Sequence, residues 1–287
     1  MVKVLSCRRM LGVPPTTNAE KSIMNSPRTH ASGSPVWFEL ATNDQAAARK
    51  FYADVFGWES SDSPPFPDGS VYTSFQLGGR DVGACYTMMA GQATQGVPPN
   101  WCTYFKVDDV DATVAAVRAT GGQVLVEPYE VMGLLRMAAC TDPEGAAFSL
   151  AQLGTHTGAG AVRENNAVCW VELATRDLPR AEAFYCGLFD WQTTDFPNSP
   201  TPYRLYSNGD GTLGGLMAMD EQWGDMPSHW SIYVQVEDVD ATAARAEAAG
   251  GKLCFPAFDV PGVGRIARII DPSGAGFYVI KLNGQAA

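Results

Sequence analysis

The chain repeats itself once over most of its length, and this repeat limits the possible folds more than any other feature. The segment VWFELAT at residues 36–42 returns 133 residues later as CWVELAT at residues 169–175. Residues 101–122 and 230–251 are identical at 12 of 22 positions. One repeat of this length indicates duplication of a whole domain and pairing of the copies about a pseudo-twofold axis, because a solenoid needs many short units.

Length and composition agree with two domains of ordinary size. The 287 residues are 46% hydrophobic and 18% charged, which excludes a chain that is disordered or fibrous over most of its length. No apolar run approaches the roughly 20 residues of a membrane-spanning helix, so we expect a soluble protein without a membrane partner. We predict a leader at 1–33, two homologous domains at 34–153 and 166–283, and a linker at 154–165.

The leader is basic and poor in acidic side chains. It lacks an apolar block long enough for a secretory signal peptide, and we interpret it as a flexible tail. The same composition also fits an organelle transit peptide, and Met24 also fits as the start of a shorter product.

Charge and cysteine usage restrict the partners and the compartment. With 31 acidic and 20 basic side chains the formal charge is -11, which disfavours binding to the phosphate backbone of a nucleic acid. The seven cysteines are scattered and form no CxxC pair. This pattern indicates free thiols in a reducing compartment, and we expect a cytoplasmic protein.

Each copy divides again into two similar units. A β-rich run at residues 35–40 precedes a helix that Asn43 or Asp44 would cap, and residues 72–89 then show the alternation of strands joined by a tight turn. The same order restarts at Trp101. The predicted module is therefore βαβββ, present four times, which gives an α+β fold with two strongly curved mixed sheets.

Several motifs occur in the same order in both copies and resemble those of the vicinal oxygen chelate superfamily. They are the βαβββ order, a Phe-Tyr pair late in the first helix (Phe51-Tyr52 and Phe184-Tyr185), the segments VDDVD and VEDVD, and the turns that begin at Asp142 and Asp271. This superfamily contains glyoxalase I, extradiol dioxygenases, fosfomycin resistance enzymes and bleomycin resistance proteins. The resemblance covers residues 35 to about 283 and implies two tandem glyoxalase-like domains.

The resemblance also implies where a metal ion would bind. Metal-using members hold a divalent ion with His, Gln or Glu side chains from the first and last strands of the modules. Counted from the shared motifs, these positions here carry Trp37, Trp170, Cys102, Ser231, Ser149, Tyr278 and, in a looser alignment, Cys85 and Met217. A hard divalent cation needs about three imidazole or carboxylate ligands, so we expect no metal and no cofactor.

In such folds a site takes half of its residues from each of two paired domains. One cup would then contain Trp37, Cys85, Ser231 and Tyr278, and the other Trp170, Met217, Cys102 and Ser149. Tyr104 and Tyr233 lie two positions further along their strands than Cys102 and Ser231, and are expected to face the same cups. Aromatic and sulfur-containing side chains form a polarizable lining that suits a flat or aromatic ligand.

Glu39 and Glu172 are expected to point into the cups, because each lies two residues after a tryptophan of the same strand. An inward carboxylate with few compensating charges has a raised pKa and could act as a catalytic acid or base, or bind a ligand amine. The alternative is a glutamate at the rim that is hydrogen-bonded to a neighbouring strand.

The other polar candidates carry weaker signals. His30, His156 and His229 are the only histidines, and none lies in a pattern that predicts a hydrolase triad. Arg136 and Arg265 occupy matching places before the two Asp-Pro turns. A structural ion pair is the favoured role for both, and a substrate anchor is the alternative.

The favoured function is metal-independent binding of a small, partly aromatic molecule in cups between the two domains. The alternative is an enzyme of the same superfamily, a lyase, isomerase or oxygenase that uses Glu39 and Glu172 or a non-standard metal site. A secreted or surface interaction protein is a third possibility. We expect a monomer with pseudo-twofold symmetry or a homodimer.

Overall fold

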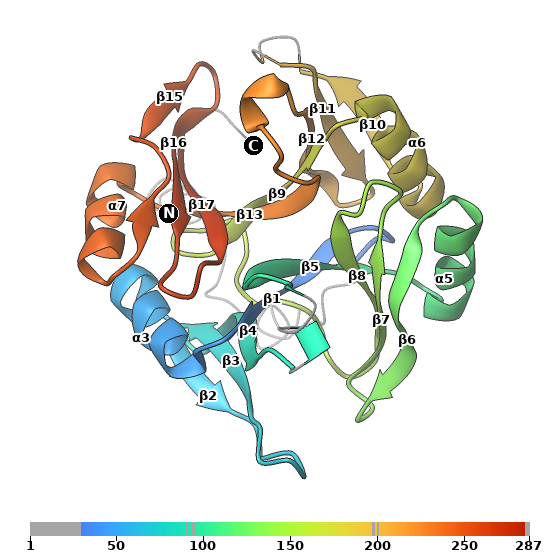
Figure 1. Cartoon of the computed structure of the whole chain (residues 1–287), viewed down its shortest axis with the longest axis horizontal. Helices are drawn as coiled ribbons and strands as arrows, with labels where there is room; N and C mark the ends of the chain where they lie inside the picture. The colour runs from blue at the N-terminus through green and yellow to red at the C-terminus, as the bar shows by residue number, and fades with distance from the viewer. Residues whose placement is uncertain (1–29, 90, 93–95, 197–198, 200, 285–287) are drawn as a thin grey trace, which may run out of the picture.

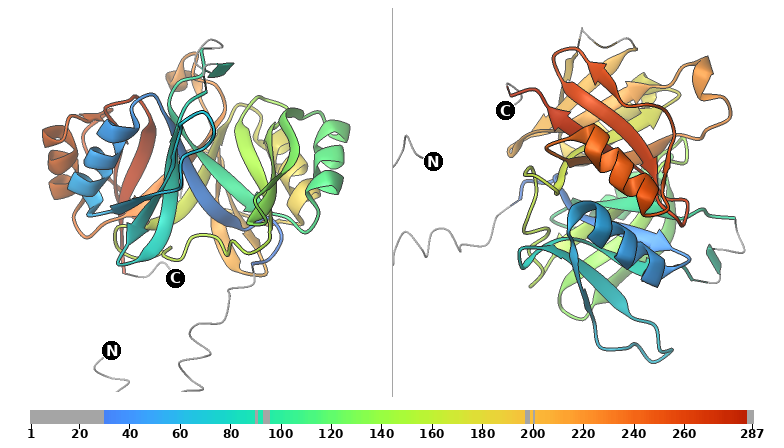
Figure 2. Two further views of the ribbon diagram at one scale, coloured as in Figure 1. Left: turned by 90° about the horizontal axis from the view of Figure 1, so that it is seen from below. Right: turned by 90° about the vertical axis from the view of Figure 1, so that its left-hand side faces the viewer.

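The computed structural model describes residues 30–89, 91–92, 96–196, 199 and 201–284. Its two halves each form one curved mixed sheet, and the helices lie on the outer flanks of the molecule (Figures 1 and 2). The first half contains β1 (Pro35–Thr42), α3 (Gln45–Phe56), β2 (Glu59–Asp62), β3 (Tyr72–Leu77), β4 (Arg80–Thr87), β5 (Asn100–Lys106), α5 (Val110–Ala119), β6 (Gln123–Val131), β7 (Leu135–Thr141) and β8 (Ala147–Leu153).

The second half repeats this order with small changes. It contains β9 (Val168–Thr175), α6 (Leu178–Phe189), β10 (Gln192–Asp195), β11 (Tyr203–Asn208), β12 (Gly211–Ala218), the 3-10 helix η1 (Glu221–Trp223), β13 (His229–Gln235), α7 (Val239–Ala248), β14 (Lys252–Leu253), β15 (Phe258–Val260), β16 (Gly264–Ile270) and β17 (Gly276–Leu282). The predicted βαβββ modules and the α+β fold class are confirmed.

Each sheet is built from the two modules of a single half. The first runs β2-β3-β4-β1-β5-β8-β7-β6, with β1 antiparallel to β5 at its centre. The second runs β10-β11-β12-β9-β13-β17-β16-β14, with β9 antiparallel to β13. Side chains that meet on one sheet therefore come from one half of the chain.

The helices begin where the sequence indicates. The carboxylates of Asp44 and Asp109 accept hydrogen bonds from Ala47 N and Ala112 N, and Asp177 and Asp238 cap the two helices of the second half in the same way. Each cap satisfies a backbone N–H that has no partner within the helix. Asp44 is therefore the cap, and Asn43 is not.

The helices of one half pack against those of the other. Figure 1 shows α3 beside α7 and α5 beside α6. At the first of these contacts Tyr52 donates its hydroxyl to Asp271, with an O–O distance of 3.1 Å, and accepts a hydrogen bond from the Trp101 indole at 2.8 Å. Two of the motifs that resemble those of the superfamily, the Phe-Tyr pair of the helix and the turn that begins at Asp271, thus join the two halves.

The second contact is the pseudo-symmetric copy of the first. Tyr185 donates to Asp142 at 3.1 Å and accepts from Trp230 at 2.9 Å. All six side chains of the two contacts are buried. This reciprocal exchange supports the inference of a duplicated domain that pairs with its own copy.

The ends of the predicted segments are partly described. Residues 1–29, including Met24 and Cys7, lie outside the described residues, so the leader stays a prediction. Residues 30–33 contact the second half, since the Trp191 indole donates to Gly33 O and Ala31 N donates to Asp210. Residues of the predicted linker hydrogen-bond to the first half, for example Ala159 N to Val36 O.

In the described part of the chain, no helix is long and apolar enough to cross a membrane.

Candidate functional site

Each sheet has one side that packs beneath helices and an opposite side that we call its cup. Along β1 and β9 the side chains alternate between the two sides, so Trp37 and Glu39 share the first cup, and Trp170 and Glu172 share the second. The strand register adds the remaining cup residues. The first cup contains Trp37, Glu39, Tyr72, Tyr86, Cys102, Tyr104, Met137 and Ser149, and the second Trp170, Glu172, Tyr203, Met217, Ser231, Tyr233, Arg268 and Tyr278.

A hydrogen-bond chain crosses the floor of the first cup. The Trp37 indole donates to the Tyr72 hydroxyl at 2.8 Å, and this hydroxyl donates to Oε1 of Glu39 at 2.7 Å. The Tyr104 hydroxyl donates to Oε2 of Glu39, also at 2.7 Å. Both oxygens of the carboxylate are thus held by tyrosines from neighbouring strands.

The second cup contains the same chain. The Trp170 indole donates to the Tyr203 hydroxyl at 3.1 Å, and Tyr203 and Tyr233 each donate to Glu172 at 2.7 Å. The rings of Tyr233 and Tyr278 stack with their centroids 4.4 Å apart. Duplication has therefore preserved a Trp-Tyr-Glu-Tyr arrangement on both sheets.

Burial sets the protonation of these carboxyls. Desolvation raises the pKa of both Glu39 and Glu172, and the two tyrosine hydroxyls that bind each carboxylate offset only part of this effect. No cation pairs with either group within the described part of the chain. Each cup therefore holds a carboxyl group that keeps its proton to a higher pH than an exposed glutamate does.

Replacing both glutamates by glutamine should change how stability depends on pH. A carboxyl with a raised pKa stabilises the fold fully below its unfolded pKa of about 4.3, and this contribution is lost as the pH rises through the folded pKa. We therefore compare the free energy of unfolding of the wild type with that of Glu39→Gln/Glu172→Gln. Between the unfolded and the folded pKa, the wild-type value should fall relative to the variant value by up to about 1.4 kcal/mol per pH unit for each glutamate. Urea denaturation from pH 4 to pH 8 measures it, and parallel curves for the two proteins would contradict the burial of unpaired carboxyls.

The structure corrects the predicted grouping of the cup residues. Ser231 and Tyr278 lie with Trp170, and Cys102 and Ser149 lie with Trp37, where the Cys102 thiol is 3.3 Å from the Ser149 hydroxyl. The prediction that each cup draws on both halves is wrong, because each sheet closes between modules of one half. The cups accordingly lie within the domains and not between them.

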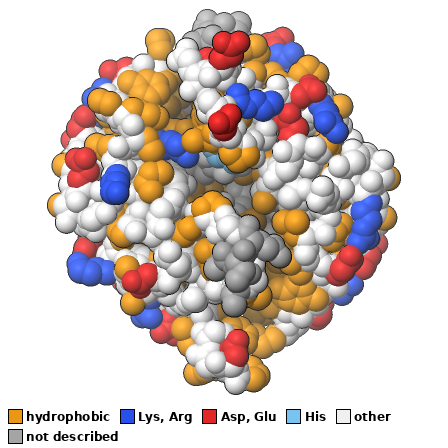
Figure 3. All heavy atoms as spheres, viewed as in Figure 1, with side chains coloured by type: hydrophobic (Ala, Val, Ile, Leu, Met, Phe, Trp, Pro, Cys, Tyr) orange, Lys and Arg blue, Asp and Glu red, His pale blue; other side chains and the backbone are white. Residues whose placement is uncertain are grey.

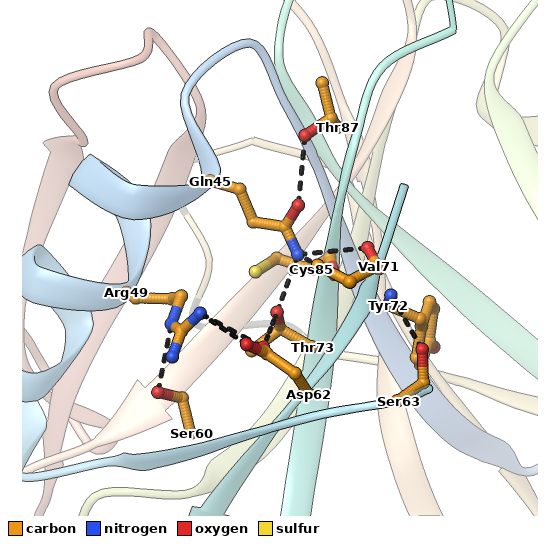
Figure 4. A network of polar contacts seen from close by, with 10 residues as sticks. All are labelled: Gln45, Arg49, Ser60, Asp62, Ser63, Val71, Tyr72, Thr73, Cys85 and Thr87. Atoms are coloured by element: carbon orange, nitrogen blue, oxygen red, sulfur yellow. Dashed lines mark hydrogen bonds and ion pairs between the residues drawn. The ribbon is translucent and has the colours of Figure 1, made fainter. Parts of the chain in front are cut away.

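Cys85 was also predicted on the wrong side of its sheet. Thr73 and Cys85 are register partners, as are Tyr72 and Tyr86, so Cys85 faces α3 while Tyr86 faces the cup. Figure 4 shows Cys85 beside Gln45 of α3, whose amide donates to the Thr73 hydroxyl at 2.6 Å and to the Cys85 carbonyl at 3.3 Å. In the second half, Met217 is the register partner of Tyr203, as Tyr86 is of Tyr72 in the first half. Met217 therefore corresponds to Tyr86, and the prediction that matched it with Cys85 was displaced by one residue.

The network beneath α3 has a counterpart with exchanged charges in the second half. In Figure 4, Arg49 of α3 pairs with Asp62 of β2 at 2.9 Å. In the second half the helix carries Glu182, and Arg204 of β11 pairs with both Glu182 and Asp195. These contacts lie on the helix side of each sheet. They connect α3 to the short strand β2 and α6 to the short strand β10.

Several cup residues were not predicted. Tyr72 and Tyr203, the central members of the two hydrogen-bond chains, were missed because the loops before them differ in length by two residues, which hides their correspondence. Both are the first residue of the strand that precedes a glycine-containing strand, β4 or β12, in their half. This shared position is the signal that could have found them. Tyr86, Met137 and Arg268 carry no motif of their own.

The residues of the cups do not fit the divalent metal of the wider superfamily. An indole provides no metal ligand, and burial raises the pKa of the Cys102 thiol to about 12, far above the range in which a thiolate would form to bind a metal. The one carboxylate of each cup is already engaged at both oxygens. Within the described residues, no three His, Cys, Asp or Glu side chains cluster as metal ligands.

Solvent reaches part of both cups. Glu39, Tyr72 and Cys102 are partly exposed in the first, as are Trp170 and Arg268 in the second. Figure 3 shows that charged side chains lie mainly along the periphery of the face seen in Figure 1, whereas hydrophobic ones gather nearer its hollowed middle. Tyr72 and Trp170 can therefore be reached from solvent, whereas the Trp37 side chain is buried, with 4% of its surface exposed.

A separate cavity of about 500 Å³ lies between the halves where β1 and β9 begin. Val36, Phe38 and Val171 contribute apolar walls, and of the predicted site residues only Trp170 takes part in the lining. The cavity lies on the opposite side of β1 from Glu39.

The remaining sequence candidates find structural roles. Arg136 pairs with Asp111 at 2.8 Å and Arg265 with Asp240 at 2.7 Å, which confirms the favoured ion-pair role. The His156 ring packs edge-on against the Trp37 indole with centroids 4.6 Å apart.

The family model described as the Glyoxalase/Bleomycin resistance protein/Dioxygenase superfamily matches residues 34–150 and 167–279. The chain is 41% identical over 253 residues to "Putative glyoxylase CFP32" of Mycobacterium tuberculosis, covering 88% of this chain and 96% of that protein. It is 34% identical over 262 residues to "Anthracycline biosynthesis protein DnrV" of Streptomyces peucetius, covering 88% and 94%.

Solved structures share the fold at low sequence identity. The Mn(II)-bound glyoxalase from Novosphingobium aromaticivorans superposes with a TM-score of 0.60 at 16% identity, covering 88% of this chain and 83% of that one. The 2,3-dioxygenase LapB from Pseudomonas sp. KL28 gives 0.60 at 13% identity, covering 88% and 93%. These likenesses concern the fold alone.

Proposed function

The chain belongs to the glyoxalase/bleomycin resistance protein/dioxygenase superfamily, and from this premise we propose that it binds a small, partly aromatic molecule in its two cups without a metal ion. The observation that carries the proposal is the duplicated Trp-Tyr-Glu-Tyr chain. It occupies the region where metal-using relatives place their ligands, and it offers a flat aromatic surface beside a polar anchor.

The chemistry of the cups favours a planar ligand with hydroxyl or amine groups. A planar molecule would lie against Trp37 or Trp170, and a donor on it would compete with a tyrosine for the buried glutamate. The name of the Streptomyces relative refers to anthracycline biosynthesis, which supports a polycyclic aromatic compound as the ligand class. We propose that ligand binding replaces one tyrosine hydrogen bond to the glutamate with one from the ligand.

A second candidate function is catalysis in the same cups. The raised pKa of Glu39 and Glu172 favours a protonated carboxyl that could act as a general acid, and the mycobacterial relative is named as a putative glyoxylase. In that case the reaction would be a lyase, isomerase or oxygenase reaction at a carbon next to a polar group. Turnover that disappears in both Glu39→Gln and Glu172→Gln, with ligand affinity retained, would favour this candidate over binding alone.

Titration with anthraquinone-2-carboxamide, a neutral planar probe, tests the binding proposal. We expect quenching of the protein's tryptophan fluorescence, and an approximately tenfold weaker affinity with most of the quenching lost in Trp37→Leu/Trp170→Leu, because these indoles form the stacking surface. Trp58→Phe, on the helix side of the sheet, is the matched control and should bind as the wild type does. Equal binding by the double variant and the wild type would refute the assignment of the cups.

One chain carries both cups, so we propose that a monomer with internal pseudo-symmetry is sufficient for binding and that a homodimer is the alternative, which light scattering distinguishes. We propose a cytoplasmic location, because six cysteines of the described chain are free thiols. The formal charge of -11 supports a small molecule and not a nucleic acid as the partner.

A further inference from the structure

The two cups differ in charge at one position. Arg268 of β16 lies opposite Tyr278 of β17 and faces the second cup, whereas the matching position of the first half is Ala139, opposite Ser149. The Arg268 guanidinium lies over the Tyr278 ring, 5.8 Å from its centroid. The second cup therefore contains a cation that the first cup lacks among the described residues.

A nearby glycine accommodates this arginine. A Cβ atom at Gly276 would come within 3.1 Å of the Arg268 guanidinium, and the corresponding residue of the first half is Ala147. The halves thus carry matched pairs, Ala139 with Ala147 and Arg268 with Gly276. The guanidinium therefore has slightly more room beside Gly276 than it would have beside an alanine.

Arg268 has no acidic partner among the described residues. Other half-buried arginines, Arg136, Arg204 and Arg265, each form an ion pair with a carboxylate. The Nε atom of Arg268 is buried without any hydrogen-bond partner, and one terminal nitrogen makes only a long contact of 3.9 Å to the Cys254 sulfur. A buried, unpartnered donor on a cation is costly unless a ligand satisfies it.

A second polar group of this cup is unsatisfied as well. His229 of β13 lies on the same side of its strand as Ser231, with Nδ1 2.8 Å from the Pro227 carbonyl, so that Nδ1 carries the hydrogen. Its Nε2 is buried without a partner. Burial and the charge of Arg268 lower the pKa of His229, so this ring is neutral near pH 7 and Arg268 is the anion-binding group.

We infer that the second cup takes an aromatic molecule that carries a carboxylate, with Arg268 as its counter-ion, whereas the first cup takes an uncharged one. The inference rests on the proposed function and specifies its ligand class. A carboxylate can accept from both Nε and a terminal nitrogen of one guanidinium, and the adjacent Tyr233 and Tyr278 rings provide an aromatic surface.

Calorimetric titration of the full chain with anthraquinone-2-carboxylate and its neutral carboxamide tests this inference. The second cup should bind the carboxylate at least about tenfold more tightly than the carboxamide, because one charge-assisted hydrogen bond distinguishes them. In Arg268→Met this preference, measured as the ratio of the two affinities, should vanish. Arg180→Met, which removes an exposed positive charge, is the matched control and should keep the preference.

A gain-of-function variant makes the test independent of how well Arg268→Met folds. Ala139→Arg/Ala147→Gly transfers the arginine and its space to the first cup, which should then acquire the carboxylate preference. Equal affinity of the wild type for the two probes would overturn the inference, and so would a preference that survives in Arg268→Met. In either case, binding of the carboxamide by the wild type would still support the proposed function. Failure of the wild type to bind either probe would contradict the proposed function itself.

Discussion

Asp271→Ala should lower the free energy of unfolding by about 3–5 kcal/mol, because it removes a buried acceptor on which several groups depend. One carboxylate oxygen accepts from the backbone N–H groups of residues 273–275, and the other accepts from Tyr52 of the opposite half. All of these donors would lose their partner at once. Urea denaturation followed by tryptophan fluorescence measures the change.

Two controls separate the turn from the contact between the halves. Tyr52→Phe removes only the hydrogen bond across the halves and should cost about 1 kcal/mol. Asp240→Ala breaks an exposed ion pair with Arg265 and should cost less than about 1 kcal/mol. A loss in Asp271→Ala no larger than that in Tyr52→Phe would show that the turn does not depend on its carboxylate.

Gly215→Ala should disable the second cup while leaving the first intact. A Cβ atom at Gly215 would lie 1.8 Å from the Tyr203 hydroxyl, a distance at which the tyrosine has to leave its place between Trp170 and Glu172. We expect the number of anthraquinone-2-carboxamide molecules bound per chain to fall from two to one, or the affinity of the second cup to drop by more than about tenfold. Calorimetric titration reports both quantities.

The first half provides the matched control for this substitution. Ala84 is the register partner of Glu39, as Gly215 is of Glu172, so Ala84→Gly removes a methyl group where Gly215→Ala adds one. It should leave both cups able to bind. Unchanged binding stoichiometry and affinity in Gly215→Ala would show that the Tyr203 hydroxyl has no part in ligand binding.

The repeat was sufficient to predict the fold. It located four modules, and within them the side chains of Trp37 and Glu39 share a cup because residues two apart on a strand face the same way. Cap positions such as Asp109 were also predictable, since a short polar side chain before a helix satisfies its free N–H groups.

The composition of each cup was not predictable to the same degree. Spacing along a chain does not say which modules pair, so Ser231 and Tyr278 were placed opposite Trp37 when they belong with Trp170. Cys85 was misplaced for a different reason: a displacement of one residue moves a side chain to the other side of a sheet, and the strand around Gly83 has no motif that fixes the register. Arg268 was missed because its counterpart is an alanine.

The central claim is that these cups bind an aromatic molecule without a metal ion. Calorimetric titration with anthraquinone-2-carboxamide, before and after exhaustive treatment of the protein with a chelator, tests it most directly when metal content is measured on the same samples. The affinity and the stoichiometry should be the same in both titrations. Binding that disappears after chelation and returns with one equivalent of a divalent metal would contradict it.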